Sequence, residues 1–197
     1  MTEPQANNSM VLAAETASRT PGVSQAMNEM PRQSAVFLDR DGTLIEDRGH
    51  LDEASAAVFY ADAFPALRLL QQQFALYMVT HQPGIAQGIV SANAVDAVNR
   101  AVTDRFERVG IRIQAVYCCP HERADGCVCI KPKPHFPQDA ARTYRLDLTR
   151  SFVVGDHPHD EELGRNCGAT GIYLLTGHGR KHLDEQIGRA SCRERVC

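Results

Sequence analysis

Short apolar runs alternate with longer amphipathic segments along the middle of the chain. The apolar runs end in polar residues or glycine and cover residues 35–39, 74–80, 113–119, 151–156 and 171–177. Runs of this kind are typical of strands buried on both faces. Between them, residues 62–73 and 91–109 carry apolar side chains at helical spacing, and weaker helical patterns cover 136–145 and 159–167. The alternation predicts a mainly parallel sheet with helices on both faces, which is a three-layer α/β/α sandwich.

Both ends of the chain depart from this pattern. Residues 1–33 are rich in Ala, Ser, Thr, Asn, Gln and Met with weak apolar periodicity, so we expect a disordered N-terminal extension. The stretch "IGRASCRERV" resembles the translation of a sequencing adapter, so we exclude residues 187–197 from the fold as a non-native tail. One folded domain is therefore expected over residues 34–186.

Composition narrows the class of protein. With 43% hydrophobic and 23% charged residues, the chain has the composition of an ordinary globular domain. The net charge of −3 gives no electrostatic basis for binding nucleic acid or a membrane surface, and the apolar runs are too short to span a membrane. The N-terminus lacks the basic start and long apolar stretch of a secretory signal. We expect a cytoplasmic monomer whose partner is a small molecule.

Polar and charged residues follow the predicted strands. Asp39 and Asp41 end the first strand, Thr80 ends the second, Lys131 follows the third, and Asp156 ends the fourth. The carboxyl ends of parallel strands meet at one edge of a sheet, so these side chains are expected to converge on one pocket. Carboxylate oxygens are the ligands that Mg²⁺ takes while it keeps water and phosphate oxygens as partners. The pattern predicts a magnesium and phosphate site.

The two aspartates of the first strand suit nucleophilic catalysis. A carboxylate can attack phosphorus once a metal ion and a lysine neutralise the charge of the phosphate, which makes Asp39 the candidate nucleophile. Asp41 stands two residues further along an extended chain and therefore on the same side. There it is placed to protonate the leaving oxygen and later to activate water. Thr80 and Lys131 are expected to hold phosphate oxygens.

A second group of candidate ligands lies before Lys131. The sequence "CCPHERADGCVC" contains the pattern C-x-H-x₅-C-x-C, formed by Cys119, His121, Cys127 and Cys129. Thiolate and imidazole ligands at this spacing favour a closed tetrahedral Zn²⁺ site that stabilises a loop and has no catalytic water. The alternative is a loop of reduced cysteines.

The motifs together resemble the haloacid dehalogenase (HAD) superfamily of phosphatases. "FLDRDGT", Thr80, Lys131 and "VVGDHPHD" match its four motifs in order and spacing over about residues 34–180. The resemblance implies a Rossmann-like fold and an aspartyl-phosphate intermediate on Asp39. It also implies that Asp39, Asp156 and the backbone carbonyl of Asp41 bind Mg²⁺, with Asp160 in a supporting role.

The zinc pattern resembles the small branch of this superfamily that contains heptose bisphosphate and histidinol-phosphate phosphatases. The stretch between the first two strands is too short for a cap domain. "HQPGIAQG" and "DRGH" resemble substrate-contacting stretches of the heptose enzymes. The substrate-binding candidates are Asp47, Arg48, Gly49, His50, His81, Gln82, Pro83, Ile130 and His157.

Three positions depart from the branch pattern. His81 replaces Asn, Ile130 replaces an Arg that precedes the lysine, and His157 replaces Lys. Isoleucine cannot provide the bidentate anion contact of an arginine. We expect D-glycero-D-manno-heptose 1,7-bisphosphate as the first substrate and histidinol phosphate as the alternative. A zinc-stabilised binding protein without turnover is a third hypothesis, which the intact set of catalytic residues argues against.

Overall fold

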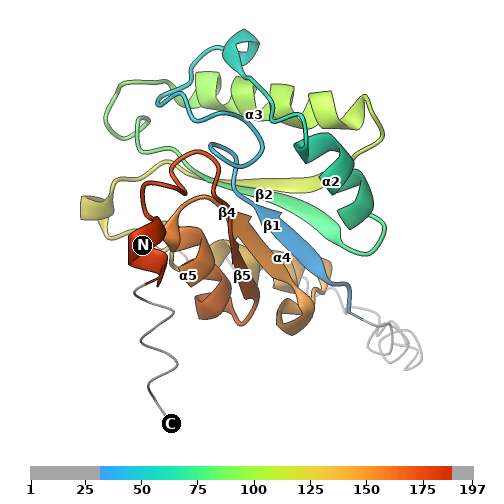
Figure 1. Ribbon diagram of the computed structural model, residues 1–197. Helices are drawn as coiled ribbons and strands as arrows, with labels where there is room; N and C mark the ends of the chain where they lie inside the picture. Colours follow the sequence, from blue (N-terminus) through green and yellow to red (C-terminus); the bar gives the residue numbers. More distant parts are fainter. Residues whose placement is uncertain (1–31, 188–197) are drawn as a thin grey trace, which may run out of the picture. The chain divides into compact units, whose positions relative to one another are not determined.

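Five parallel strands form a single sheet at the centre of the computed structural model, which describes residues 32–187. The order across the sheet is β3-β2-β1-β4-β5 (Figure 1). The strands are β1 (Ala35–Leu38), β2 (Ala75–His81), β3 (Ile113–Cys119), β4 (Phe152–Gly155) and β5 (Thr170–Tyr173). The predicted parallel sheet is thus confirmed. Apart from residues 32, 33 and 187, the predicted disordered extension and non-native tail lie outside the described residues.

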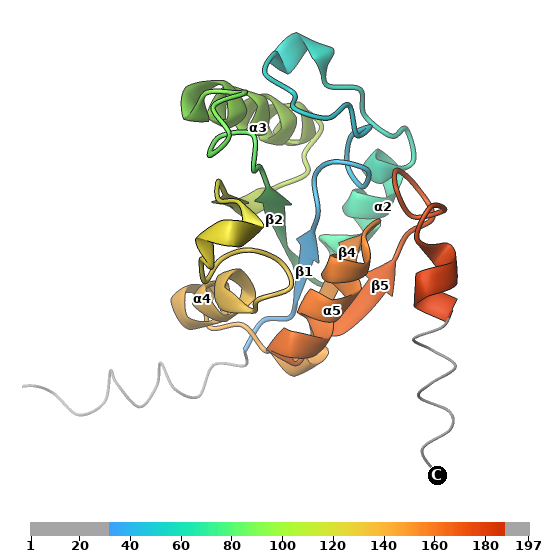
Figure 2. The ribbon, with the colours of Figure 1, turned by 90° about the vertical axis from the view of Figure 1, so that its left-hand side faces the viewer.

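Helices cover both faces of the sheet (Figures 1 and 2). The helices are α2 (Ala63–Leu70), α3 (Ala92–Glu107), α4 (His135–Tyr144) and α5 (Pro158–Cys167), and the short 3₁₀ turns are η1 (Ala54–Ala56), η2 (Arg123–Asp125) and η3 (Leu148–Arg150). One group of buried side chains joins β1 and β2 to α2 and α3, and another joins them to α4 and α5. The three-layer α/β/α sandwich is therefore confirmed. Among the described residues, no helix has the length and hydrophobicity needed to cross a membrane.

Strand β1 contributes to both layers because successive side chains of a strand point to opposite faces. Val36 and Leu38 belong to the core beneath α2 and α3. Ala35 and Phe37 belong to the core beneath α4 and α5. All four side chains are buried, which explains why this segment is a continuous apolar run rather than an alternating one.

Local signals in the sequence fix the ends of the helices. The Ser91 side chain caps α3 by accepting a hydrogen bond from the amide of Ala94 at 3.1 Å. Helix α5 begins with Pro158, and its first turn is closed by hydrogen bonds between His157 and Asp160. It ends at Gly168, whose φ of 82° suits glycine.

No cap domain separates β1 from β2. Residues 39–74, which are all described, contain only η1 and α2 as regular elements. The carboxyl end of the sheet is consequently open at the positions where Asp39 and Asp156 emerge. Strand β5 is shorter than the predicted run of 171–177, since the chain leaves the sheet after Leu174 donates its amide to Gly155 at 2.8 Å.

Candidate active site

A cavity of about 400 Å³ lies at the carboxyl ends of the strands. Its walls come from segments that are far apart in the sequence and adjacent in the fold. Its lining residues are Asp39, Asp41, Asp47, Gly49, His50, His81, Gln82, Pro83, Arg123, Lys131, Asp156, His157, His159, Asp160 and His178. The structure therefore brings together all four predicted acidic residues, the lysine and most of the predicted substrate-binding residues.

Lys131 bridges the carboxylates of Asp39 and Asp160. Its Nζ donates hydrogen bonds to Asp39 Oδ1 at 2.5 Å and to Asp160 Oδ1 at 2.7 Å. Burial acts to lower the pKa of Lys131, but the charges of Asp160 and Asp39 outweigh it and hold the pKa above its usual value. The lysine is consequently a fixed positive charge beside the candidate nucleophile, where it can hold a phosphate oxygen.

Asp156 is held on the opposite side by backbone. Its Oδ2 accepts a hydrogen bond from the amide of His178 at 2.7 Å. Gly42 and Gly177 pack so closely on the carboxylate that a Cβ atom on either would lie 2.1 Å or 2.2 Å from Oδ2. Burial raises the pKa of Asp156, so an adjacent cation would stabilise its charged form.

Three carboxylates form a cluster that fits a divalent cation. Oxygen atoms of Asp39, Asp156 and Asp160 all lie within 4.8 Å of one another. Burial also raises the pKa of Asp39, against the opposing effect of Lys131. Mutual repulsion of buried carboxylates is relieved by a bound cation, and an all-oxygen donor set favours Mg²⁺. Both oxygens of Asp160 already accept hydrogen bonds, from Lys131 and from the amide of His157 at 3.2 Å. This agrees with a supporting role for Asp160.

The carboxylate of Asp41 is fixed by two neighbouring side chains. Arg40 Nη2 donates to its Oδ2 at 2.8 Å, and Gln82 Nε2 donates to the same oxygen at 2.7 Å. Arg40 is fully buried and donates through Nη1 to Asn99 at 2.8 Å. The candidate acid/base is thus held at the cavity wall by groups that are themselves anchored in the core.

Thr80 lies beneath the cavity rather than on its wall. The residue is 1% exposed, and its Oγ1 accepts a hydrogen bond from Gln82 Nε2 at 2.9 Å. Gln82 therefore bridges Thr80 and Asp41. The predicted phosphate contact of Thr80 remains a prediction.

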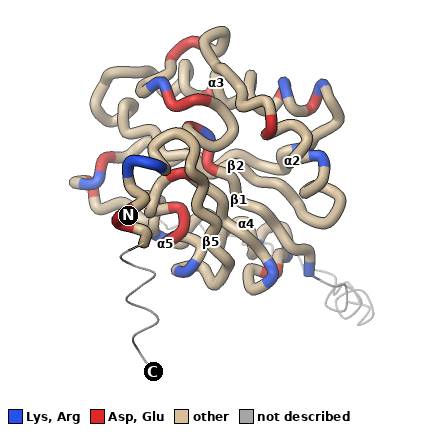
Figure 3. The backbone as a smooth tube through the Cα atoms, viewed as in Figure 1, with Lys and Arg blue, Asp and Glu red and all other residues tan. Residues whose placement is uncertain are grey.

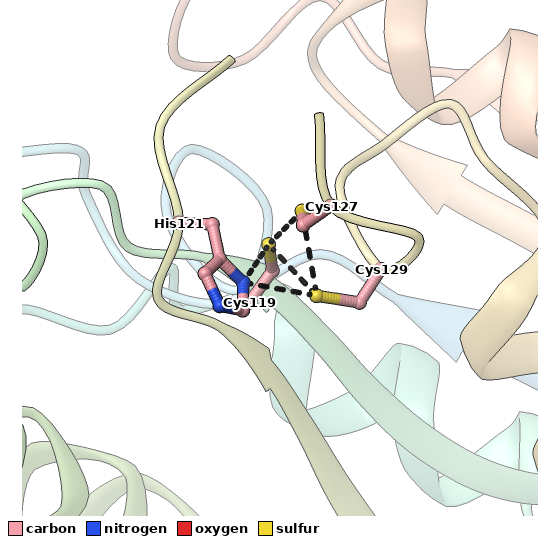
Figure 4. A group of neighbouring side chains, drawn as sticks. All are labelled: Cys119, His121, Cys127 and Cys129. Atoms are coloured by element: carbon pink, nitrogen blue, oxygen red, sulfur yellow. Dashed lines mark hydrogen bonds between the residues drawn. The ribbon is translucent and has the colours of Figure 1, made fainter. Parts of the chain in front are cut away.

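The four predicted zinc ligands converge at the end of β3 (Figure 4). The Sγ atoms of Cys119, Cys127 and Cys129 lie 3.2–3.7 Å apart, and His121 Nδ1 is 3.4 Å from Cys129 Sγ and 3.9 Å from Cys119 Sγ. Zn–S bonds of about 2.3 Å in a tetrahedron place the sulfur atoms about 3.8 Å apart, close to this spacing. The distances far exceed a disulfide bond of about 2.05 Å. The donor set and its geometry fit Zn²⁺.

The zinc loop, which is defined here as residues 119–130 and holds all four predicted ligands, is tied to the candidate active site. His81 Nε2 lies 2.8 Å from the carbonyl oxygen of His121, and the amide of Gln82 donates to the carbonyl of Cys119 at 2.8 Å. Lys133 Nζ donates to the carbonyl of Gly126 at 3.0 Å. Since the loop runs directly into Lys131, its conformation determines where the lysine stands.

Two predicted substrate-binding residues lie away from the cavity. Ile130 is 5% exposed and packs with Cys119, Cys129 and Phe136, because its side chain completes the small core under the zinc loop. Arg48 points outward and pairs with Glu46 at 2.9 Å. Neither belongs to the cavity lining.

Sequence reasoning missed one wall of the cavity. His159, which we would interpret from the sequence as a solvated loop residue, stacks on His157 with ring centroids 4.4 Å apart. Arg123 Nη2 lies 3.0 Å from the His159 ring nitrogens. Burial lowers the pKa of each histidine to about 4, so both rings are neutral at pH 7. The spacing around Pro158 could have indicated that both histidines belong to one helix start, but nothing in the sequence indicates that Arg123 reaches them.

Comparisons with known proteins agree with this geometry. Residues 128–193 match the HAD-hydrolase-like family model. The D-glycero-beta-D-manno-heptose-1,7-bisphosphate 7-phosphatase of Bordetella bronchiseptica is 31% identical over 156 residues, which cover 75% of this chain and 84% of that protein. The bifunctional histidine biosynthesis protein HisB of Campylobacter jejuni is 31% identical over 144 residues, 71% of this chain and 41% of that protein.

A solved structure extends the similarity to the whole domain. The B. bronchiseptica D,D-heptose 1,7-bisphosphate phosphatase, crystallised with magnesium and phosphate, superposes with a TM-score of 0.72 at 29% identity, over 78% of this chain and 87% of that one. The parallel sheet, the acidic cluster with its lysine and these relatives lead to one assignment. The chain belongs to the HAD family of hydrolases and is a phosphatase of that family.

Proposed function

We propose that this protein is a Mg²⁺-dependent phosphomonoesterase that hydrolyses D-glycero-D-manno-heptose 1,7-bisphosphate through an aspartyl-phosphate intermediate. The observation that carries the chemistry is the contact of Asp39 with Lys131 beside Asp156, in an open cavity at the carboxyl end of the sheet. The substrate is inferred from the names of the relatives and from the "HQPGIAQG" and "DRGH" stretches. Half of the residues in these two stretches line the cavity: Asp47, Gly49, His50, His81, Gln82 and Pro83.

The residues divide the reaction into two displacements. An Asp39 oxygen attacks phosphorus, a P–O bond forms and the ester P–O bond breaks, while Asp41 gives its proton to the leaving oxygen. Asp41 then takes a proton from water, whose oxygen attacks the same phosphorus and releases inorganic phosphate and Asp39. Lys131 holds a phosphate oxygen throughout.

The proposed metals have separate roles. Asp39, Asp156 and the Asp41 carbonyl would hold Mg²⁺, which supplies positive charge to the phosphate when bound. Cys119, His121, Cys127 and Cys129 would hold Zn²⁺ with no open coordination position, so the zinc supports the loop ahead of Lys131. The cytoplasmic location and the monomeric state stay predictions.

A panel of substrates tests the proposal. Phosphate release is measured with Mg²⁺ on heptose 1,7-bisphosphate, histidinol phosphate and p-nitrophenyl phosphate, with wild-type protein and Asp39→Asn. We expect the highest kcat/KM on the heptose bisphosphate. We expect Asp39→Asn to lose roughly four to six orders of magnitude in turnover, because the amide cannot act as the nucleophile.

The alternatives give different results in the same assay. Preference for histidinol phosphate would support the activity suggested by the similarity to HisB. Absence of turnover on every ester would favour the binding-protein hypothesis. Near-normal turnover of Asp39→Asn would end the aspartyl-phosphate mechanism.

A further inference from the structure

The cavity is strongly acidic apart from two cations. Among the described residues, Lys131 and Arg123 are the lysine and arginine side chains that line it. The acidic lining residues are Asp39, Asp41, Asp47, Asp156 and Asp160. Lys131 is engaged by two of these carboxylates at the point where the reacting phosphate must bind. A substrate with a second anionic group therefore needs a separate cation.

We propose that Arg123 binds the second phosphate of the substrate, the one that is not hydrolysed, and so sets the preference of this enzyme for bisphosphates. This inference rests on the proposed function. It places specificity on the turn between two zinc ligands, His121 and Cys127, rather than on the position before the catalytic lysine. That position holds Ile130, which is buried under the loop and does not line the cavity.

The backbone beneath Arg123 is anchored on both sides. The turn η2 is closed by Asp125, whose Oδ2 accepts the amide of Glu122 at 2.8 Å. His81 holds the carbonyl of His121 before the turn, and Lys133 holds the carbonyl of Gly126 after it. An exposed side chain on such a fixed base can reach a ligand without the ordering cost of a flexible loop.

The guanidinium is also directed toward the cavity. Its Nη2 rests on the ring of His159, which in turn stacks on His157 at the start of α5. These rings connect the zinc loop to the wall that carries Asp156. Arginine presents up to five donors in a planar arrangement that matches two phosphate oxygens, which makes it suited to this role.

The experiment compares Arg123→Ala, Arg123→Lys and wild type on heptose 1,7-bisphosphate and on p-nitrophenyl phosphate, which lacks a second anion. We expect the ratio of kcat/KM for the bisphosphate over the monophosphate to fall about 10- to 100-fold in Arg123→Ala, the range of one charge-assisted contact. The loss should appear in KM. Arg123→Lys should lose less, since it keeps the charge without the bidentate geometry.

Arg112→Ala is the matched control, because Arg112 is an exposed arginine at the opposite end of β3. Zinc content and the midpoint of thermal unfolding are measured for each variant, so that collapse of the loop is recognised. An active wild type whose substrate ratio is unaffected by Arg123→Ala would overturn this inference alone. A wild type that hydrolyses neither ester, or prefers histidinol phosphate, would overturn the proposed function and the inference with it.

Discussion

At the scale of single residues, two glycines pack so closely against Asp156 that a larger residue does not fit at either position. Gly42 (φ 79°) and Gly177 (φ 44°) both adopt the left-handed conformation. A Cβ atom on either residue would clash with Oδ2 of Asp156. The glycine of the sequence "DGT" therefore has two functions. It turns the chain after β1, and it leaves space for the carboxylate of Asp156, the proposed Mg²⁺ ligand that follows β4.

Gly42→Ala is expected to weaken Mg²⁺ binding by about 10- to 100-fold, because the new methyl group displaces Asp156. The measurement is the Mg²⁺ concentration that gives half-maximal turnover. Gly110→Ala is the control, since Gly110 has nearly the same φ of 78° and nothing within 4 Å of an added Cβ. Equal Mg²⁺ requirements in the two variants would contradict this prediction, because only Gly42→Ala places a methyl group against Asp156.

At the scale of elements, the zinc loop between β3 and α4 joins structure to chemistry. Burial raises the pKa of the Cys119 thiol, so a thiolate there needs a neighbouring positive charge. The same loop positions Lys131 and carries Arg123. Under the proposed function, loss of the zinc should therefore affect both the stability of the protein and the placement of Lys131.

Cys127→Ser is expected to lose zinc and to lower the midpoint of thermal unfolding by about 6 to 12 °C, if about 3 kcal/mol of metal-binding free energy is lost. Turnover should fall with it. Cys118→Ser is the control, because Cys118 precedes the cluster and is not part of it. Zinc content comes from elemental analysis of protein purified without chelators. A wild type without zinc, or a Cys127→Ser variant with full zinc content, would contradict the proposed site.

The elements also show which features a sequence can reveal. Strands β1 and β2 could be predicted because their side chains are buried on both faces, and the other strands because their apolar runs alternate with helical segments. Asp39, Asp41 and Asp156 could be predicted because they follow two of these strands closely. Ile130 and Arg48 lie outside the cavity lining, since adjacency in the chain does not determine which way a side chain points, and their contact with substrate stays a prediction. Arg123 and His159 could not be paired from the sequence, because their contact exists only after the zinc loop packs against α5.

At the scale of the whole molecule, negative charge is concentrated in the cavity, where a bound metal ion would supply positive charge. In the view of Figure 3, basic and acidic positions are interspersed over the described residues. Inside the cavity, by contrast, five aspartates meet two cations. Metal and phosphate should therefore bind together better than either does alone, since the cation offsets the repulsion between the aspartates and phosphate, and the phosphate oxygens add ligands to the cation.

Magnesium and inorganic phosphate together are expected to raise the midpoint of thermal unfolding by more than the sum of their separate effects. At about 100 times the dissociation constant, a ligand adds about 2.7 kcal/mol of stability, or about 5 to 11 °C for a domain of this size. The comparison uses protein dialysed free of Mg²⁺ without a chelator, so that zinc is retained. Equal stabilisation by phosphate with and without Mg²⁺ would contradict a shared site.

The hydrogen bond between Lys131 and Asp39 joins residues 92 positions apart, and Asp156 follows later still. During synthesis, the nucleophile therefore leaves the ribosome long before any group that activates it. Strand β1 pairs with β4 in the finished sheet, so its second neighbour is absent until most of the domain has been made. Under the proposed function, phosphatase activity therefore begins only when the late strand β4 is inserted beside the early strand β1.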